Sequence, residues 1–368
     1  MDSNLSMGAR NLLENCARLR SGDRLLVLAE DAATGFYDPR LGDALRAGAE
    51  AMGVQATLRA VPFVPSVTGL PETLAPDIAQ ADQVLFLARL GDQLRFSPAL
   101  ADLHPVVSYA LDTDMLGSGF GWAHHDAFEA LKTCLNAALT AARHIRVTCP
   151  LGTDFEGPGA RFPELAGEVT VRRFPMSMFA PVPAGPYRGR IAQAGFLTGT
   201  GSTYYTPYSV ALDGVLTVGF DGTRITGFDG SASDVATAHA HYDRVASGLG
   251  IDRDYVHSWH AGIHPGCAYR QQAGADLARW SGGAFGNPRL LHFHTCGAYA
   301  PGEISLNVVD PTIRLDGVAV WDHGRLHPER VPGGAEILAR YPCAAHVFAN
   351  PSPDIGLAAS GRLSAWVG

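Results

Sequence analysis

The chain has 368 residues, of which 46% are hydrophobic and 17% are charged, and its formal net charge is −8. This length predicts one large or two medium domains with a sizeable buried core. The negative balance and the lack of a basic run argue against nucleic acid as a partner, because phosphate neutralisation needs clustered Lys and Arg. No apolar run approaches the roughly 20 residues that span a bilayer, so no membrane partner is expected.

The six cysteines are scattered along the chain, and none forms a CxxC pair. The N-terminal segment has neither the charge nor the apolar core of a signal peptide. In such a chain, scattered cysteines indicate reduced thiols rather than a disulfide framework. We therefore expect a soluble, cytoplasmic protein.

Helical and extended segments alternate over residues 1–150. Helices are expected over residues 6–20, 38–53 and 126–142, and strands over residues 24–29, 54–60, 83–88 and 144–148. This alternation predicts a parallel sheet covered by helices. The segment after the first strand, Ala29–Gly35, has no Gly-x-Gly-x-x-Gly fingerprint, so dinucleotide binding has no support. Residues 1–150 are thus expected to form an α/β scaffold domain.

Shorter strands, turns and more glycine are typical of residues 151–368. The Asp-Gly pair at 221–222 predicts a β-hairpin over residues 215–228, and Ser233 can cap a helix over residues 234–247. Further strands are expected over residues 255–263, 289–296, 304–309 and 318–321. This half therefore predicts a β-rich α+β domain, and the whole chain an α/β fold class.

Two histidines in the strand expected over residues 289–296 are candidate metal ligands. His292 and His294 are two residues apart, so on a strand they share a face and can hold one ion. Glu303 follows nine residues after His294, and His260 lies in an earlier strand. Two imidazoles and one carboxylate are the usual ligands of a catalytic non-haem iron. We therefore expect an Fe(II) site in the second domain.

Four short motifs have counterparts in one known family: Phe36-Tyr37-Asp38, Cys149-Pro150-Leu151-Gly152-Thr153-Asp154, the hairpin 215–228 and His260-Ala261-Gly262. They resemble motifs of the aminopeptidase T family of metallopeptidases and of the related 2,5-dihydroxypyridine dioxygenases. This resemblance implies an α/β N-terminal domain, a β-rich C-terminal domain that carries the metal, and a homodimer.

The resemblance also indicates which residues of this chain correspond to the iron ligands of the dioxygenases. His260 corresponds to the first iron histidine of the dioxygenases. Their later His-x-Asp pair falls on Glu303 and Ser305 by distance along the chain, but on His292 and His294 by residue type. We take His260, one or both of His292 and His294, and Glu303 as the expected ligand set, which gives two or three imidazoles and one carboxylate.

A peptidase is the less favoured reading of the same resemblance. The peptidases carry a glutamate in a stretch that matches residues 174–179, where this chain has no acid. A dinuclear hydrolytic centre needs bridging carboxylates and a base that activates water. A site rich in histidine and poor in acid fits a single redox-active iron better.

We therefore predict a non-haem Fe(II) oxygenase, a ring-cleaving dioxygenase that combines O₂ with a small hydroxylated aromatic or N-heteroaromatic compound. His264 is the first choice for the base that deprotonates the substrate hydroxyl, and His124 or His125 the second, because imidazole titrates near neutral pH. Tyr299 is expected to donate a hydrogen bond to substrate or reduced oxygen. Aromatic side chains are expected to wall the pocket: Trp259, Phe293 and Tyr299. The alternative role is packing in the core, and for Phe293 core packing is the favoured expectation.

Two other functions stay as alternatives. The first is a Zn- or Co-dependent aminopeptidase or other metallohydrolase of the same fold. The second is a metal-free protein that binds small molecules, in which the histidines only form hydrogen bonds within the sheet.

Overall fold

The computed structural model describes residues 3–65, 67, 69–162, 170–200, 205–297 and 303–357. The chain divides into two compact units that interleave along the sequence. The first comprises Met1–Glu129, Leu165–Ser177 and Tyr341–Ala349, and the second comprises Ala130–Glu164, Met178–Arg340 and Asn350–Gly368. None of the helices in the described ranges has the length and apolar character needed to cross a membrane.

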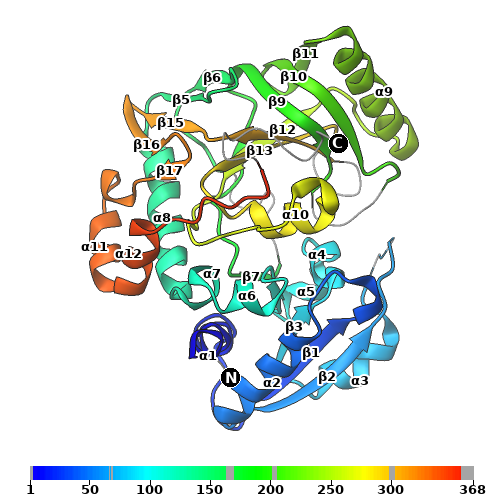
Figure 1. Cartoon of the computed structure of the whole chain (residues 1–368), viewed down its shortest axis with the longest axis vertical. Helices are drawn as coiled ribbons and strands as arrows, with labels where there is room; N and C mark the ends of the chain where they lie inside the picture. Colours follow the sequence, from blue (N-terminus) through cyan, green and yellow to red (C-terminus); the bar gives the residue numbers. More distant parts are fainter. Residues whose placement is uncertain are drawn as a thin grey trace. The chain divides into compact units, whose positions relative to one another are not determined.

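The first unit contains a parallel sheet with the strand order β2-β1-β3-β4-β7 (Figure 1). Its strands are β1 (Arg24–Glu30), β2 (Gln55–Val61), β3 (Gln83–Leu87), β4 (Val106–Ser108) and β7 (Arg172–Phe174). Its helices are α1 (Ser3–Arg10), α2 (Arg40–Ala51), α3 (Ala75–Ala79), α4 (Arg89–Gln93), α5 (Pro98–Ala101), α6 (Thr113–Leu116), α7 (Gly119–Trp122) and α12 (Pro342–Ala349). The parallel sheet and its first three expected strands are confirmed. β3 is buried along its whole length, as a central parallel strand should be.

The first helix differs from its prediction over residues 6–20. It ends at Arg10 and passes into a π-helical segment, Asn11–Cys16. The buried amide of Asn11 donates to the carbonyl oxygens of Gly121 and Ala123. These contacts join residues more than a hundred positions apart, so local periodicity gives no sign of them.

In the second unit the strands pair in the order β17-β16-β15-β5-β6-β9-β14-β13-β12-β8, and β10 pairs with β9 and β11. The strands are β5 (Ile145–Thr148), β6 (Asp154–Gly157), β8 (Val182–Pro183), β9 (Arg188–Thr198), β10 (Ser209–Asp221), β11 (Arg224–Asp229), β12 (Val256–Ala261), β13 (Leu290–Thr295), β14 (Ile304–Val309), β15 (Thr312–Leu315), β16 (Val318–Asp322) and β17 (Arg325–Leu326). The helices α9 (Ala232–Leu249), α10 (Leu277–Ala284) and α11 (Gly334–Arg340) belong to this unit, and α8 (His125–Ala141) continues into it.

One strand expected in the parallel sheet pairs elsewhere. The segment predicted over residues 144–148 forms β5, but β5 is antiparallel to β6 and β15 in the sheet of the second unit. The composition of a segment predicts that its backbone is extended. The sheet that the strand joins depends on the strand with which it pairs. For β5 that partner, β15, lies more than 150 residues further along the chain.

The expected hairpin over residues 215–228 is confirmed as β10 and β11 (Figure 1). Asp221 pairs with Arg224, and Gly222 has a φ of 61°, which glycine adopts without strain. The helix that follows begins earlier than expected, because Ser231 rather than Ser233 accepts the capping hydrogen bond. Asp234 instead accepts from two backbone N–H groups at the bulge of β10.

The sheet around β12, β13 and β14 has one aromatic face. The ring of Phe155 meets those of Trp259 and Phe293 edge-on, at centroid distances of 5.4 and 5.0 Å. Tyr187 and Phe220 also pack edge-on against Phe155. All five side chains are buried. This packing stabilises one face of the three strands, and the opposite face carries the histidines.

His241 on α9 is a buried imidazole in this unit. It is 0% exposed, its ring lies 5.8 Å from that of Tyr205, and neither ring nitrogen forms a hydrogen bond within the described ranges. Burial, with a smaller contribution from Arg244, lowers the pKa of His241 to about 4. Desolvation thus keeps this side chain neutral in the folded protein at neutral pH.

The stability of the protein should therefore fall on acidification. Between about pH 6.5 and about pH 4 the unfolded chain binds a proton at His241 that the folded chain does not, so stability is lost as the pH falls through this window. We expect His241→Phe to reduce the loss between about pH 7 and about pH 4.5 by on the order of 2 kcal/mol, measured by urea unfolding. Identical pH dependence of wild type and variant would contradict this account.

Candidate metal centre

Three histidines lie on one face of the sheet because of strand alternation and register. His292 and His294 are two residues apart on β13, so their side chains project to the same side. His260 on β12 pairs directly with His292, and directly opposed residues of antiparallel strands share a face. The sequence thus folds locally so that two neighbouring strands bring three imidazoles together.

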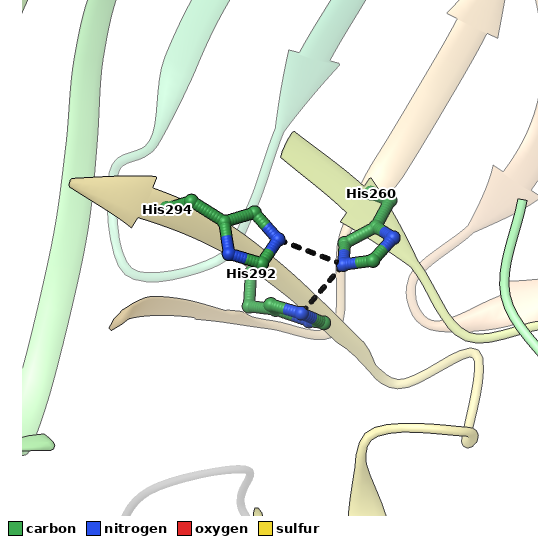
Figure 2. A group of neighbouring side chains, drawn as sticks. All are labelled: His260, His292 and His294. Atoms are coloured by element: carbon green, nitrogen blue, oxygen red, sulfur yellow. Dashed lines mark hydrogen bonds between the residues drawn. The ribbon is translucent and has the colours of Figure 1, made fainter. Parts of the chain in front are cut away.

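The ring nitrogens of these histidines converge (Figure 2). His260 Nε2 lies 2.6 Å from His292 Nε2 and 3.0 Å from His294 Nε2. One ligand atom from each residue lies within 4.8 Å of the others, and no further group of this kind occurs among the described residues. Two nitrogens that bind one ion at about 2.1 Å and at right angles lie about 3 Å apart. The observed spacing therefore fits imidazoles on adjacent positions of one ion.

Hydrogen bonds on the outer side of the rings decide which nitrogens carry protons. His260 Nδ1 lies 3.2 Å from the carbonyl oxygen of Phe179, and His294 Nδ1 lies 2.6 Å from Glu303 Oε1. Carbonyl and carboxylate oxygens only accept, so in both neutral rings Nδ1 carries the proton and Nε2 has a bare lone pair. Two lone pairs 3.0 Å apart repel each other unless a cation lies between them. The donor set therefore fits a metal ion.

The centre is largely shielded from water. His260 and His292 are 4% and 2% exposed, and the ring of Phe285 stacks on His292 at 4.3 Å. His257 lies next to His294, with ring centroids 6.4 Å apart. Burial lowers the pKa of His257 to about 4, so this ring adds no positive charge at neutral pH. The triad thus lies in a largely buried site to which His257 adds no positive charge.

Glu303 lies beside the three converging nitrogens rather than among them. Its carboxylate is 3% exposed and bonds to His294 Nδ1, while its backbone oxygen accepts from the Tyr205 hydroxyl. The sequence predicted a carboxylate ligand at this position. The contact observed is the one by which an outer carboxylate orients a metal-binding histidine and raises its basicity.

Gly262 positions the end of β12 behind His260. A Cβ built on Gly262 would lie 2.4 Å from the backbone of Gly286 and Asn287, and the Trp321 indole N–H donates to the Gly262 carbonyl. Only glycine allows this close approach. The glycine of the His260-Ala261-Gly262 motif thus has a packing role, which its sequence alone does not reveal.

The residues expected to act as bases have local backbone contacts in the structure. His264 is fully buried, and its Nδ1 accepts the Gly266 N–H at 3.2 Å. His124 and His125 belong to the first unit, where His124 Nδ1 accepts the Asp126 N–H near the start of α8. Tyr299 lies outside the described residues. The catalytic roles expected of these four residues stay predictions.

The aromatic wall expected at Trp259 is wrong, whereas Phe293 lies in the core, the role that the sequence favoured for it. Trp259 and Phe293 each follow or precede a triad histidine directly, so alternation places them on the opposite face, in the aromatic core. Phe285, which the sequence analysis missed, is the aromatic ring against the triad. Phe179, whose carbonyl orients His260, was also missed, because a backbone contact leaves no signal in residue type.

Comparisons with known proteins bear on the fold. No family model and no curated protein sequence matches this chain. Among solved structures, 2,5-dihydroxypyridine dioxygenase from Pseudomonas putida KT2440 is similar, with a TM-score of 0.60 and 16% identity over 89% of this chain and 98% of that one. AmpT, an aminopeptidase T, from Thermus thermophilus is similar with a TM-score of 0.50 and 12% identity over 88% and 98% of the two chains. This chain therefore has the mixed α/β fold of these two proteins, as the short motifs implied.

Proposed function

We propose that the chain is a non-haem Fe(II)-dependent oxygenase, a ring-cleaving dioxygenase that acts on a small hydroxylated aromatic or N-heteroaromatic compound. The observation that carries the proposal is the convergence of three imidazoles on one centre without a carboxylate among them. Imidazole suits iron, whereas a dinuclear hydrolytic centre needs several bridging carboxylates. The likeness of fold to a dioxygenase supports the same reading.

In this proposal His260, His292 and His294 hold the metal. An Fe(II) ion bound there supplies redox chemistry and a template on which the substrate hydroxyl and O₂ are oriented together. The Phe179 carbonyl and Glu303 keep protons on Nδ1 of two of the rings, so that their Nε2 atoms stay available. Phe285 restricts rotation of His292 and excludes water from it. We keep His264 as the proposed proton acceptor and the homodimer as the proposed assembly.

A mononuclear metallohydrolase is the second candidate, and one observation favours it. Three histidines are also a zinc ligand set, in which bound water loses its proton near neutral pH. The fold likeness to an aminopeptidase T agrees with this reading. Metal identity and oxygen dependence separate the two candidates.

The first experiment measures oxygen uptake. Protein purified anaerobically and loaded with Fe(II) is expected to consume O₂ in the presence of a compound from a panel of dihydroxypyridines and catechols, with loss of the aromatic absorbance. Zn(II)-loaded protein is the control and should consume none. Release of amino acids from small peptides without oxygen would instead establish the hydrolase.

His260→Ala should abolish metal retention, because it removes the nitrogen that lies closest to both other imidazoles. Metal analysis after loading and desalting should fall from about one ion per chain to near zero, with the circular dichroism spectrum unchanged. His144→Ala, a change at an exposed histidine of the same unit, should retain the metal. Full metal content in His260→Ala would show that the ligand set is different.

Glu303→Gln tests the outer carboxylate. The amide oxygen still accepts from His294 Nδ1, but the negative charge that raises the basicity of the ring is lost. We expect metal affinity to fall roughly 10- to 100-fold, measured by competition with a chelator. Glu156→Gln is the matched control, because Glu156 contacts the exposed His144. Equal losses in both variants would remove Glu303 from the metal centre.

A further inference from the structure

The face that carries the histidines continues as a polar surface onto β14 and β9. Register places two rows of side chains on this face, each row crossing neighbouring strands through directly opposed residues: Ser258, His294, Ser305 and Thr198 in one row, and His260, His292 and Asn307 in the other. The opposite face of the same strands is the aromatic core. Seven polar residues thus share the face of these strands that lies opposite the aromatic core.

Two of these polar residues each have a side-chain group without a hydrogen-bond partner in the described part of the chain. Asn307 is 3% exposed and Thr198 is 0% exposed. Within the described ranges, Asn307 Nδ2 and Thr198 Oγ1 form no hydrogen bond, although the Ser305 hydroxyl donates to Asn307 Oδ1 at 3.1 Å. A buried polar group without a partner destabilises a protein, and such groups in a native structure indicate a missing ligand or a functional role.

Comparable groups nearby are engaged. Thr295, on the opposite face of β13, bonds to the Tyr242 hydroxyl at 2.7 Å and to the Ile304 carbonyl at 2.8 Å. The side-chain amide of Gln193 donates to two backbone carbonyls, and its oxygen accepts the Asn307 N–H. Thr198 and Asn307 thus differ from these engaged neighbours, although other buried groups of this unit, such as the Trp259 indole N–H, also have no partner within the described ranges. The groups concerned in Asn307 and Thr198 are one N–H donor and one hydroxyl.

We propose that Asn307 and Thr198 form the subsite for a second polar group of the aromatic substrate, an inference that rests on the proposed function. Neighbouring strands lie about 4.8 Å apart, so Asn307 lies one strand beyond His292, and Thr198 lies two strands beyond His294. A second oxygen that is meta or para to the metal-bound hydroxyl extends further from the metal, toward Thr198 two strands away, than an ortho oxygen does. The subsite therefore selects rings whose second oxygen is meta or para to the metal-bound hydroxyl.

The test measures binding rather than turnover. Zn(II)-loaded protein is titrated anaerobically by calorimetry with phenol, catechol, resorcinol and hydroquinone. Wild type should bind hydroquinone or resorcinol about 10-fold more tightly than phenol, the gain of one good hydrogen bond. Thr198→Val and Asn307→Leu should each remove this advantage and leave the binding of phenol and catechol unchanged.

Matched variants separate a ligand role from a structural one. Thr198→Val removes a hydroxyl that has no partner, so its melting temperature should equal or exceed that of wild type. Thr295→Val removes an engaged hydroxyl on the other face, so it should melt at a lower temperature and bind hydroquinone as wild type does.

Three results would overturn the inference. The first is unchanged hydroquinone and resorcinol binding in both variants. The second is loss of metal in Asn307→Leu, which would make Asn307 a ligand. The third is the absence of any diphenol binding by metal-loaded protein. Oxygen uptake by the Fe(II)-loaded protein tests the proposed function separately, because it can persist when the subsite variants bind like wild type.

Discussion

The pairing register of β12 and β13 is the constraint on which the candidate metal centre depends. It places His260 opposite His292, and alternation along β13 then adds His294. A slip of one residue would turn both β13 histidines into the aromatic core and bring Phe293 to the other side. Large rings prevent this slip, because Phe155 packs edge-on against Trp259 and Phe293 at once. Core packing on one face thus determines the chemistry that is available on the other.

A backbone carbonyl and a carboxylate then determine which ring nitrogen carries the proton in two of the histidines. Phe179 and Glu303 hold the protons on the outer nitrogens, which leaves the inner nitrogens as donors to a cation. Phe179 lies far from His260 along the chain. Glu303 lies directly before β14. Without a cation the inner lone pairs face each other, and without a ligand the adjoining polar groups are buried and unsatisfied. These are the groups that the proposed metal ion and substrate would satisfy, and in their absence the unmet contacts cost stability.

The sequence predicts individual elements better than their partners. The strand around His292 and His294 follows from its apolar run, and their common face follows from a period of two. The pairing of His260 with His292 joins two distant segments, so local patterns cannot predict it. The same limit explains why β5 was expected in the wrong sheet. Trp259 was misplaced for another reason: alternation already puts the neighbours of strand histidines on the far face, and the aromatic-wall expectation ignored it. Glu303 was found by residue type, but its contact with His294 Nδ1 needed the structure.

The interleaving of the two units has a consequence for synthesis of the protein. The parallel sheet of the first unit is completed by β7, and Phe348 of α12 stacks on Phe128 within the same unit. A nascent chain of 150 residues contains neither of these elements. The first unit therefore cannot finish folding on the ribosome before the second unit, which carries the histidines, has been translated almost completely. The edge strand β4 stays unpaired until β7 has been translated, and an unpaired edge strand is a template for association with other chains.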